Sequence, residues 1–223
     1  MQHKCWTVDR PKGVAVDDDG NILVADYEND RIQKFKPDGT FFTAVGKQGD
    51  KPLEFTGPIG IGTGSIYVTE YGNHRIQILN PDLTFSSCFG GYGTGNGQFR
   101  HPHDMAFDSN GNVYVADWGN HCIQVFSADG QFLRQFGSKG SGSVSEDLVN
   151  HPSSITIDSD NVLYVTECNK HCISVFTCEG KFLTSFGTQG SEPGQFDLPF
   201  GVVVDKNGIL YATEIINHRV QLF

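Results

Sequence analysis

The sequence lacks long hydrophobic runs and has few basic residues. No segment approaches the roughly 18 continuous apolar residues of a membrane span, and the first residues, MQHKCWTVDRPKG, contain no apolar core of signal-peptide type. Sixteen Lys and Arg stand against 26 Asp and Glu, for a formal net charge of -10. This charge repels a polyanion unless the basic groups gather on one face, so it disfavours nucleic acid as a ligand. We expect a cytoplasmic protein with no membrane partner.

Paired cysteines and catalytic motifs are also missing. The six cysteines show none of the C-x2-C spacing of a structural zinc site, so free thiols in a reducing compartment are expected. No GxSxG, glycine-rich phosphate loop or HExxH is present, and no helical pattern follows the glycine-rich FGGYGTGNGQF. The sequence therefore predicts no cofactor and offers no catalytic site.

What the sequence does contain is a repeat of 44 to 50 residues. Each copy has an apolar strand such as GVAVD, a tight turn rich in Asp, Asn and Gly, and a second strand such as ILVAD. A polar loop, a third strand such as RIQKF and a fourth such as TFFTAVG follow. Four antiparallel strands per repeat predict an all-β fold, a β-propeller of four-stranded blades, as one domain over residues 1–223. The copies open at Pro11, Pro58, Pro102, Pro152 and Pro199.

The last repeat is incomplete, because the chain stops at Phe223 after the third strand of its fifth copy. A closed ring would need a strand from the N-terminal end, and the candidate is the short run from Lys4 to Thr7, which the repeat phase assigns to a loop. Two alternatives are open, a five-bladed propeller and a fragment of a six-bladed ring, and we favour the fragment. Its final strand would then present an unpaired edge.

The signature letters GNHRIQ, GNHCIQ and NHRVQ, within the pattern GVAVD, GNI, VAD, RIQ, DG and FG, resemble the NHL repeat over nearly the whole chain. The chain is thereby similar to the substrate-recognition propellers of TRIM-NHL and malin-type E3 ubiquitin ligases. No RING-type Cys/His cluster is present, so this chain is not expected to transfer ubiquitin by itself. The resemblance implies a protein-recognition or scaffold module in ubiquitin-dependent turnover that binds a protein partner or ubiquitination substrate. RNA binding is the alternative, which the net charge disfavours.

Polar residues at constant positions of the repeat predict structural roles. A carboxylate ends each second strand, and an arginine five residues later is its expected partner in three copies. Cys122 and Cys172 take the arginine position in the middle copies, so Asp117 and Glu167 need other donors if they are buried. The carboxylates are Asp26, Glu70, Asp117, Glu167 and Glu214; the recurrent histidines are His74, His121, His171 and His218, with Asp30 in the first copy.

The residue after each carboxylate is large or apolar but varies between copies. Because this position follows the second strand, at the rim where the chain enters the next blade, we predict an apolar, partly aromatic binding surface. Ordinary packing is the alternative. The residue after each opening proline is expected to face the same rim. The predicted binding residues are Tyr27, Tyr71, Trp118, Cys168 and Ile215, together with Lys12, Ile59, His103, Ser153 and Phe200.

The sequence HPHD, residues 101–104, raises one enzyme hypothesis. Resemblance to the peptide-amidating lyase would imply a metal held by three imidazoles, each following such a proline. Only His103 does so here, and one imidazole cannot hold a catalytic zinc. A metal-dependent lyase is therefore the least favoured function. The soft ligands of CNKHC, residues 168–172, occupy ordinary repeat positions, so we predict no metal site.

Overall fold

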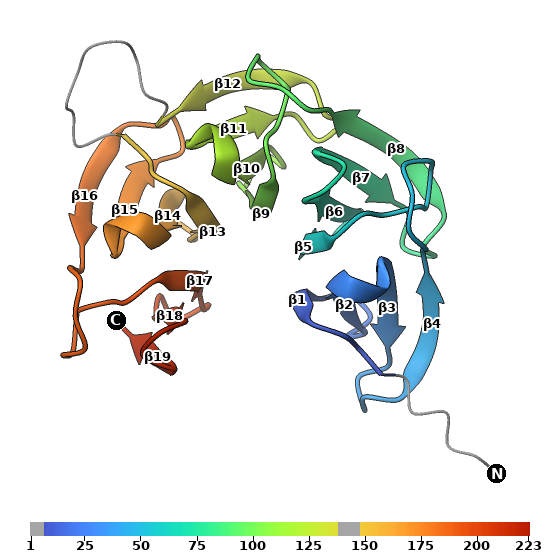
Figure 1. Ribbon diagram of the computed structural model, residues 1–223, viewed down its shortest axis with the longest axis horizontal. Coiled ribbons are helices and arrows are strands. Elements are labelled where there is room, and N and C mark those ends of the chain that lie inside the picture. Colours follow the sequence, from blue (N-terminus) through green and yellow to red (C-terminus); the bar gives the residue numbers. More distant parts are fainter. Residues whose placement is uncertain (1–6, 138–147) are drawn as a thin grey trace. The chain divides into compact units, whose positions relative to one another are not determined.

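The computed structural model describes residues 7–137 and 148–223, and nearly all of its regular structure is β-strand (Figure 1). The strands gather into two compact units, unit 1 within residues 1–92 and unit 2 within residues 93–223. No helix in the described ranges is long and apolar enough to cross a membrane. The all-β propeller class is confirmed, while the assignment of both units to one domain stays a prediction.

Unit 1 contains two four-stranded antiparallel sheets, in the orders β1-β2-β3-β4 and β5-β6-β7-β8. Each strand pairs with the next along the chain, so each sheet is a meander and forms one blade. The strands are β1 (Pro11–Val16), β2 (Ile22–Asp26), β3 (Arg31–Phe35), β4 (Phe41–Val45), β5 (Pro58–Gly62), β6 (Ile66–Glu70), β7 (Arg75–Leu79) and β8 (Phe85–Gly90).

Unit 2 contains three sheets of the same kind. Two have four strands and the last has three, in the order β17-β18-β19, as the incomplete fifth repeat predicts. The strands are β9 (Pro102–Phe107), β10 (Val113–Asp117), β11 (Cys122–Phe126), β12 (Phe132–Phe136), β13 (Pro152–Ile157), β14 (Val162–Glu167), β15 (Cys172–Thr177), β16 (Phe182–Phe186), β17 (Pro199–Val204), β18 (Leu210–Glu214) and β19 (Arg219–Leu222).

An aspartate forms the tight turn between the first two strands of a blade. Asp17 Oδ1 accepts the backbone N–H groups of Asp19 at 3.1 Å and Asn21 at 2.8 Å, and Gly20 takes a left-handed φ of 80°. These contacts are those of an Asx turn, which explains the Asp, Asn and Gly of the predicted hairpins. The corresponding aspartates of unit 2 are Asp108, Asp158 and Asp205.

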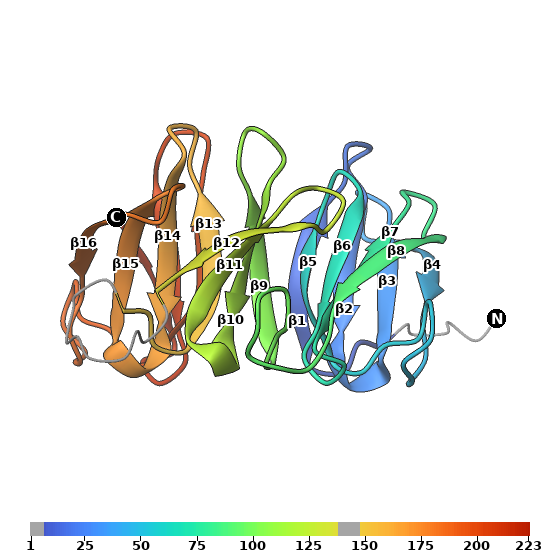
Figure 2. The same ribbon diagram turned by 90° about the horizontal axis from the view of Figure 1, so that it is seen from above.

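Short 3-10 turns follow the second strand in three blades, where the sequence predicted only a polar loop. They are η1 (Tyr27–Asn29), η2 (Trp118–Asn120) and η3 (Cys168–Lys170). In each unit they lie at the opposite end of the blades from the Asp-containing hairpin turns (Figure 2), and we call the 3-10 end the rim. The turns end on Asp30, His121 and His171, whose φ values are 48°, 55° and 54°, in a region that Asp and His tolerate better than most residues.

Alternate apolar residues pack the blades of each unit against one another. In unit 1, Leu23 and Ala25 of β2 share a buried cluster with Ile61 of β5 and Val68 of β6. Each such side chain contributes about 1.5–3 kcal/mol when it is fully buried, or less for alanine. The rim side chains are therefore carried on a packed framework.

The run from Lys4 to Thr7, the candidate closing strand that the repeat phase assigns to a loop, lies outside the described residues except for Thr7. The Thr7 carbonyl accepts a hydrogen bond from Arg31 Nη2 at 2.8 Å, and Thr7 and Val8 are not part of a strand. This segment of the described chain is thus attached to the rim end of the first blade.

Candidate functional site

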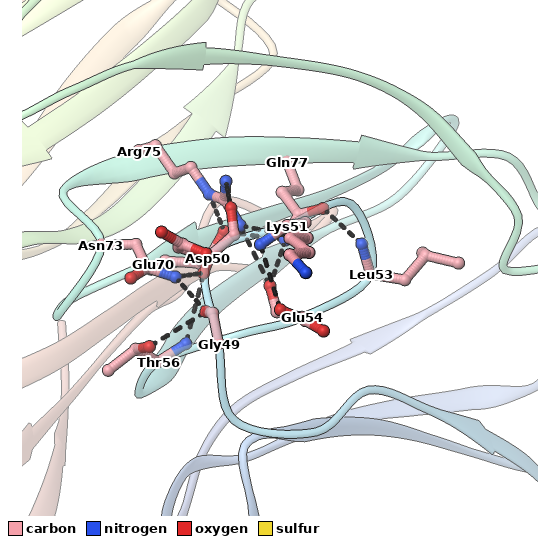
Figure 3. A network of polar contacts seen from close by, with 10 residues as sticks. All are labelled: Gly49, Asp50, Lys51, Leu53, Glu54, Thr56, Glu70, Asn73, Arg75 and Gln77. Atoms are coloured by element: carbon pink, nitrogen blue, oxygen red, sulfur yellow. Dashed lines mark hydrogen bonds and ion pairs between the residues drawn. The ribbon is translucent and has the colours of Figure 1, made fainter.

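A buried carboxylate organises the rim of each blade, and Glu70 of unit 1 shows the arrangement (Figure 3). Arg75 Nε donates to it at 2.6 Å, Gln77 Nε2 at 2.9 Å and Asn73 Nδ2 at 2.5 Å. The backbone N–H of Thr56, in the loop that enters the blade, completes the set at 3.3 Å. Burial raises the pKa of Glu70, while the hydrogen bond and charge of Arg75 oppose that rise. The carboxylate therefore fastens the incoming loop to the second and third strands.

The predicted arginine partners are confirmed in three blades. Arg75 also donates to the carbonyl oxygens of Lys51 and Glu54, at 3.2 and 3.0 Å, so its guanidinium holds the incoming loop from a second side. The predicted structural role of these residues is thereby confirmed. The pairs are Arg31 with Asp26, Arg75 with Glu70 and Arg219 with Glu214, at 2.7, 2.6 and 2.6 Å.

The third blade fills the same position without a guanidinium. Asp117 has no exposed surface and accepts from Arg100 N at 2.9 Å, Asn120 Nδ2 at 2.7 Å and Gln124 Nε2 at 2.8 Å. All three donors are neutral groups, and burial raises the pKa of Asp117 to about 6. A cavity of about 250 Å³ lies beside Cys122, which takes the place of the arginine.

The fourth blade replaces the guanidinium by an ammonium. Lys170, at the position where the other blades have asparagine, places Nζ 3.0 Å from Glu167 Oε2. Asn150 N donates to Glu167 at 2.6 Å, and Ser174 Oγ donates to its other oxygen. The two middle blades therefore supply the other donors that the sequence required, and in the fourth blade one of these donors carries a positive charge.

A second recurrent contact joins one blade to the next. Asp30 Oδ1 accepts the backbone N–H of Gly57 at 2.8 Å in unit 1. In unit 2, His121 Nδ1 accepts from His151 N at 3.2 Å. We call these contacts the junction hydrogen bonds, and they give His121 and His171 the structural role predicted for the recurrent histidines. The third one joins His171 Nδ1 to Leu198 N at 3.3 Å.

The rim of unit 1 contains a pocket of about 230 Å³ between η1 and the loop that enters the second blade. Tyr27 and Tyr71, both half-buried, line it together with Glu28 and Asp30. Burial and the negative charges nearby raise the pKa of Tyr27. Lys12 Nζ lies 5.7 Å from the Tyr27 ring centroid. Three predicted binding residues of unit 1 therefore meet at one place, which we call the tyrosine pocket.

The rim of unit 2 brings together a second group of predicted residues. His103 stacks on Trp118, with ring centroids 5.5 Å apart and an interplanar angle of 10°, and meets Phe200 edge-on at 6.0 Å. Ser153 Oγ donates to the Phe200 carbonyl at 2.9 Å, and Cys168 Sγ to the neighbouring Pro199 carbonyl. We call Trp118, His103, Ser153, Cys168 and Phe200 the tryptophan cluster.

Burial divides the predicted residues in a way that repeat phase could not show. Ile59, His103 and Ser153 are buried, whereas Ile215 is 46% exposed. Trp118 is half-buried and packs on His151 at 4.4 Å between centroids. That Trp118, Tyr27 and Tyr71 act in binding stays a prediction.

Acidic groups of the tyrosine pocket were missed in the sequence. Glu28 follows Tyr27 directly, so its position beside the ring was available as a signal, and Asp30 was assigned a structural role only. Gly57 lines the pocket. A glycine is needed at this position because the Cβ of any other residue would lie 2.9 Å from the Tyr27 ring. Across the part of the chain that the structure describes, no group of three His, Cys, Asp or Glu residues is placed to hold a metal ion.

Four-stranded meander sheets, repeated along the chain with apolar faces packed blade on blade, define a β-propeller. Residues 9–35, 99–126 and 149–176 match the family model of the NHL repeat. The chain thus contains NHL repeats, as the signature letters predicted, and they lie in blades of a β-propeller fold.

The chain is also similar to one curated protein in sequence and to several solved structures in fold. A 32-residue segment is 66% identical to the E3 ubiquitin-protein ligase TRIM71 of Gallus gallus and covers 14% of this chain and 4% of that protein. A solved streptogramin B lyase superposes with a TM-score of 0.69 at 17% identity, over 94% of this chain and 63% of that one. A structure of the nidogen/laminin complex gives a TM-score of 0.69 at 22% identity, over 92% and 72%. At these identities the structural likeness shows the fold alone.

Proposed function

We propose that this chain is a protein-recognition module that binds its partner through the tyrosine pocket and the tryptophan cluster. The observation that carries the proposal is the placement of Trp118, half-buried at the rim and in contact with the rings of His103 and His151. A ring held in this way loses little conformational freedom on binding, and tryptophan is enriched among residues that dominate binding energy.

The finer proposal is that the bound protein is a substrate for ubiquitin-dependent turnover, with ligase activity supplied outside this sequence. The 66% identity to TRIM71 over 32 residues supports it, and so does the NHL-repeat match. The same similarity to TRIM71 is our reason for proposing a cytoplasmic location. A protein partner is favoured over RNA because the net charge is -10 and a polyanion needs a basic surface.

The test is capture of proteins from cell extract by the immobilised chain, quantified by mass spectrometry. Trp118→Ala should reduce capture of the specific partner by about tenfold or more, the effect of a hot-spot residue. Leu133→Ala is the matched control, because Leu133 is a 47% exposed apolar residue of unit 2 on the outer strand β12, and it should capture as wild type does.

Equal capture by both variants would refute the proposal. Circular dichroism and thermal melting separate binding from folding: a loss of about 3–5 kcal/mol of stability in Trp118→Ala would show that the indole belongs to the core. Steeply salt-dependent retention of RNA instead of protein would favour the alternative ligand.

A further inference from the structure

The tyrosine pocket has the chemistry of a site for a cationic side chain. Two aromatic rings, Tyr27 and Tyr71, share a cavity of about 230 Å³ with the carboxylates of Glu28 and Asp30. Aromatic faces attract cations through the ring quadrupole, and the attraction grows when the cation loses water. Carboxylates add charge-assisted hydrogen bonds to an ammonium or guanidinium group.

The chain's own cations already contact the walls of this pocket. Lys12 Nζ lies 5.7 Å from the Tyr27 ring centroid, and Arg10 Nη1 lies 2.9 Å from Glu28 Oε1. The Arg10 side chain is 73% exposed, so its ion pair is weak and easily exchanged. The Tyr27 ring and the Glu28 carboxylate therefore already contact positive groups. A cationic ligand could displace these groups.

The pocket is a built feature of the blade junction. Asp30 accepts the Gly57 N–H at 2.8 Å, and Tyr71 N donates to the Gly57 carbonyl at 3.0 Å. Gly57, with φ 61°, allows the Tyr27 ring to approach closer than any side chain there would permit. The two rings and the Asp30 carboxylate are thus held by the same segment of backbone.

We infer that the tyrosine pocket binds a lysine or arginine side chain from a basic segment of the partner protein. The inference rests on the proposed function and names the partner chemistry that unit 1 would recognise. The overall charge of -10 favours the approach of such a segment.

The experiment titrates the full chain, carrying carbon-13 label in its tyrosine rings, with capped tripeptides and follows the ring resonances by NMR. The Gly-Lys-Gly and Gly-Arg-Gly peptides should shift the signals of Tyr27 and Tyr71, which Tyr→Phe variants assign. Gly-Gln-Gly and Gly-Glu-Gly should leave them unchanged. Shifts of equal size with Gly-Gln-Gly, or larger ones with Gly-Glu-Gly, would overturn the inference.

Two substitutions with opposite expected signs sharpen the test. Glu28→Gln should weaken binding of the lysine peptide about fivefold, because one partly exposed carboxylate is lost. Lys12→Gln should tighten it about twofold, because a competing cation leaves the Tyr27 ring. An anion-binding pocket would show the reverse order and overturn the inference. Phe42→Ala, a 56% exposed residue on the outer strand β4, should bind as wild type, and unchanged amide spectra confirm folding.

The outcome is separable from that of the proposed function. Lysine-dependent shifts without any Trp118-dependent protein capture would sustain the pocket and refute the recognition module. Trp118-dependent capture without lysine-dependent shifts would refute the pocket alone.

Discussion

Cys122→Arg should stabilise unit 2 by giving the third blade the guanidinium that the first, second and fifth blades have. The carboxylate that would receive it, Asp117, is fully buried and surrounded by neutral donors. A cavity of about 250 Å³ is lined by Cys122. In the first blade, where Arg31 Nε lies 2.7 Å from the carboxylate, the pKa of Asp26 is lowered, although burial opposes it.

The magnitude follows from the pKa of Asp117, which burial raises from 3.8 to about 6. The native protein binds this proton more tightly than the unfolded chain does, so stability is full below about pH 4 and is lost as the pH rises to about 6. At about 1.4 kcal/mol per pH unit the loss is roughly 3 kcal/mol. Arginine would recover this loss, less the cost of burying the guanidinium, so we expect a net gain of about 1–2 kcal/mol at pH 7 and a net loss of about 1 kcal/mol at pH 4, where the guanidinium faces a protonated carboxyl.

The assay is urea unfolding at pH 4 and pH 7, followed by tryptophan fluorescence in a Trp6→Phe background that leaves Trp118 as the single tryptophan. Cys122→Met, of similar length but without charge, should change stability equally at both pH values. Cys172→Arg should gain less than Cys122→Arg, because Lys170 already lies 3.0 Å from the fourth-blade carboxylate. A gain from Cys122→Arg that is equal at pH 4 and pH 7, or is matched by Cys122→Met, would refute the reasoning.

Three further substitutions probe the blade junctions and the ends of the strands. Burial and the neighbouring His121 lower the pKa of His151, so the unfolded chain protonates this histidine more readily than the folded chain does. Unit 2 should therefore lose stability as the pH falls from about 7 to about 5. His121→Asp, which copies Asp30, should reduce that loss in melting experiments, and an unchanged pH profile would contradict the role of the junction. Gly46→Ala should lower stability by about 2–3 kcal/mol because its φ is 119° and a Cβ would lie 2.5 Å from an aromatic ring. Gly39→Ala, with φ 80° and nothing within 4 Å, should cost about 1 kcal/mol from backbone strain alone; equal losses in melting temperature would contradict the steric argument.

The blades could be predicted because their determinants are local in sequence. The alternation of apolar residues and the Asx turns at residues such as Asp17 depend on neighbours a few positions away, and the five-residue spacing of Glu70 and Arg75 places both at paired positions of adjacent strands. Because the same pattern recurs in five copies, a strand assignment that is weak for one copy became firm for all of them. The 3-10 turns escaped prediction because three residues are too few to show a period.

The site could be predicted only in part, because it depends on distances between repeats. Tyr27 and Tyr71 were predicted from repeat phase, but the pocket that they share also needs the approach of Gly57 to the Tyr27 ring. Repeat phase likewise placed His103 and Lys12 in one class, although the structure buries the first and exposes the second. Burial at such positions is decided by the neighbouring blade, which a single repeat does not encode.

The junction hydrogen bonds have a consequence for how such a chain can diverge. In each of them one blade contributes a side chain and the next contributes only a backbone N–H, and the donors are Gly57, His151 and Leu198, three unrelated residues. The receiving repeat can therefore change its amino acid at that position and keep the contact, provided that the residue is not proline and that no ring lies against it as Tyr27 lies against Gly57. A duplicated repeat would carry its own acceptor and would find a donor in whichever repeat came to follow it, so copies could be gained and could drift apart in sequence while remaining able to join.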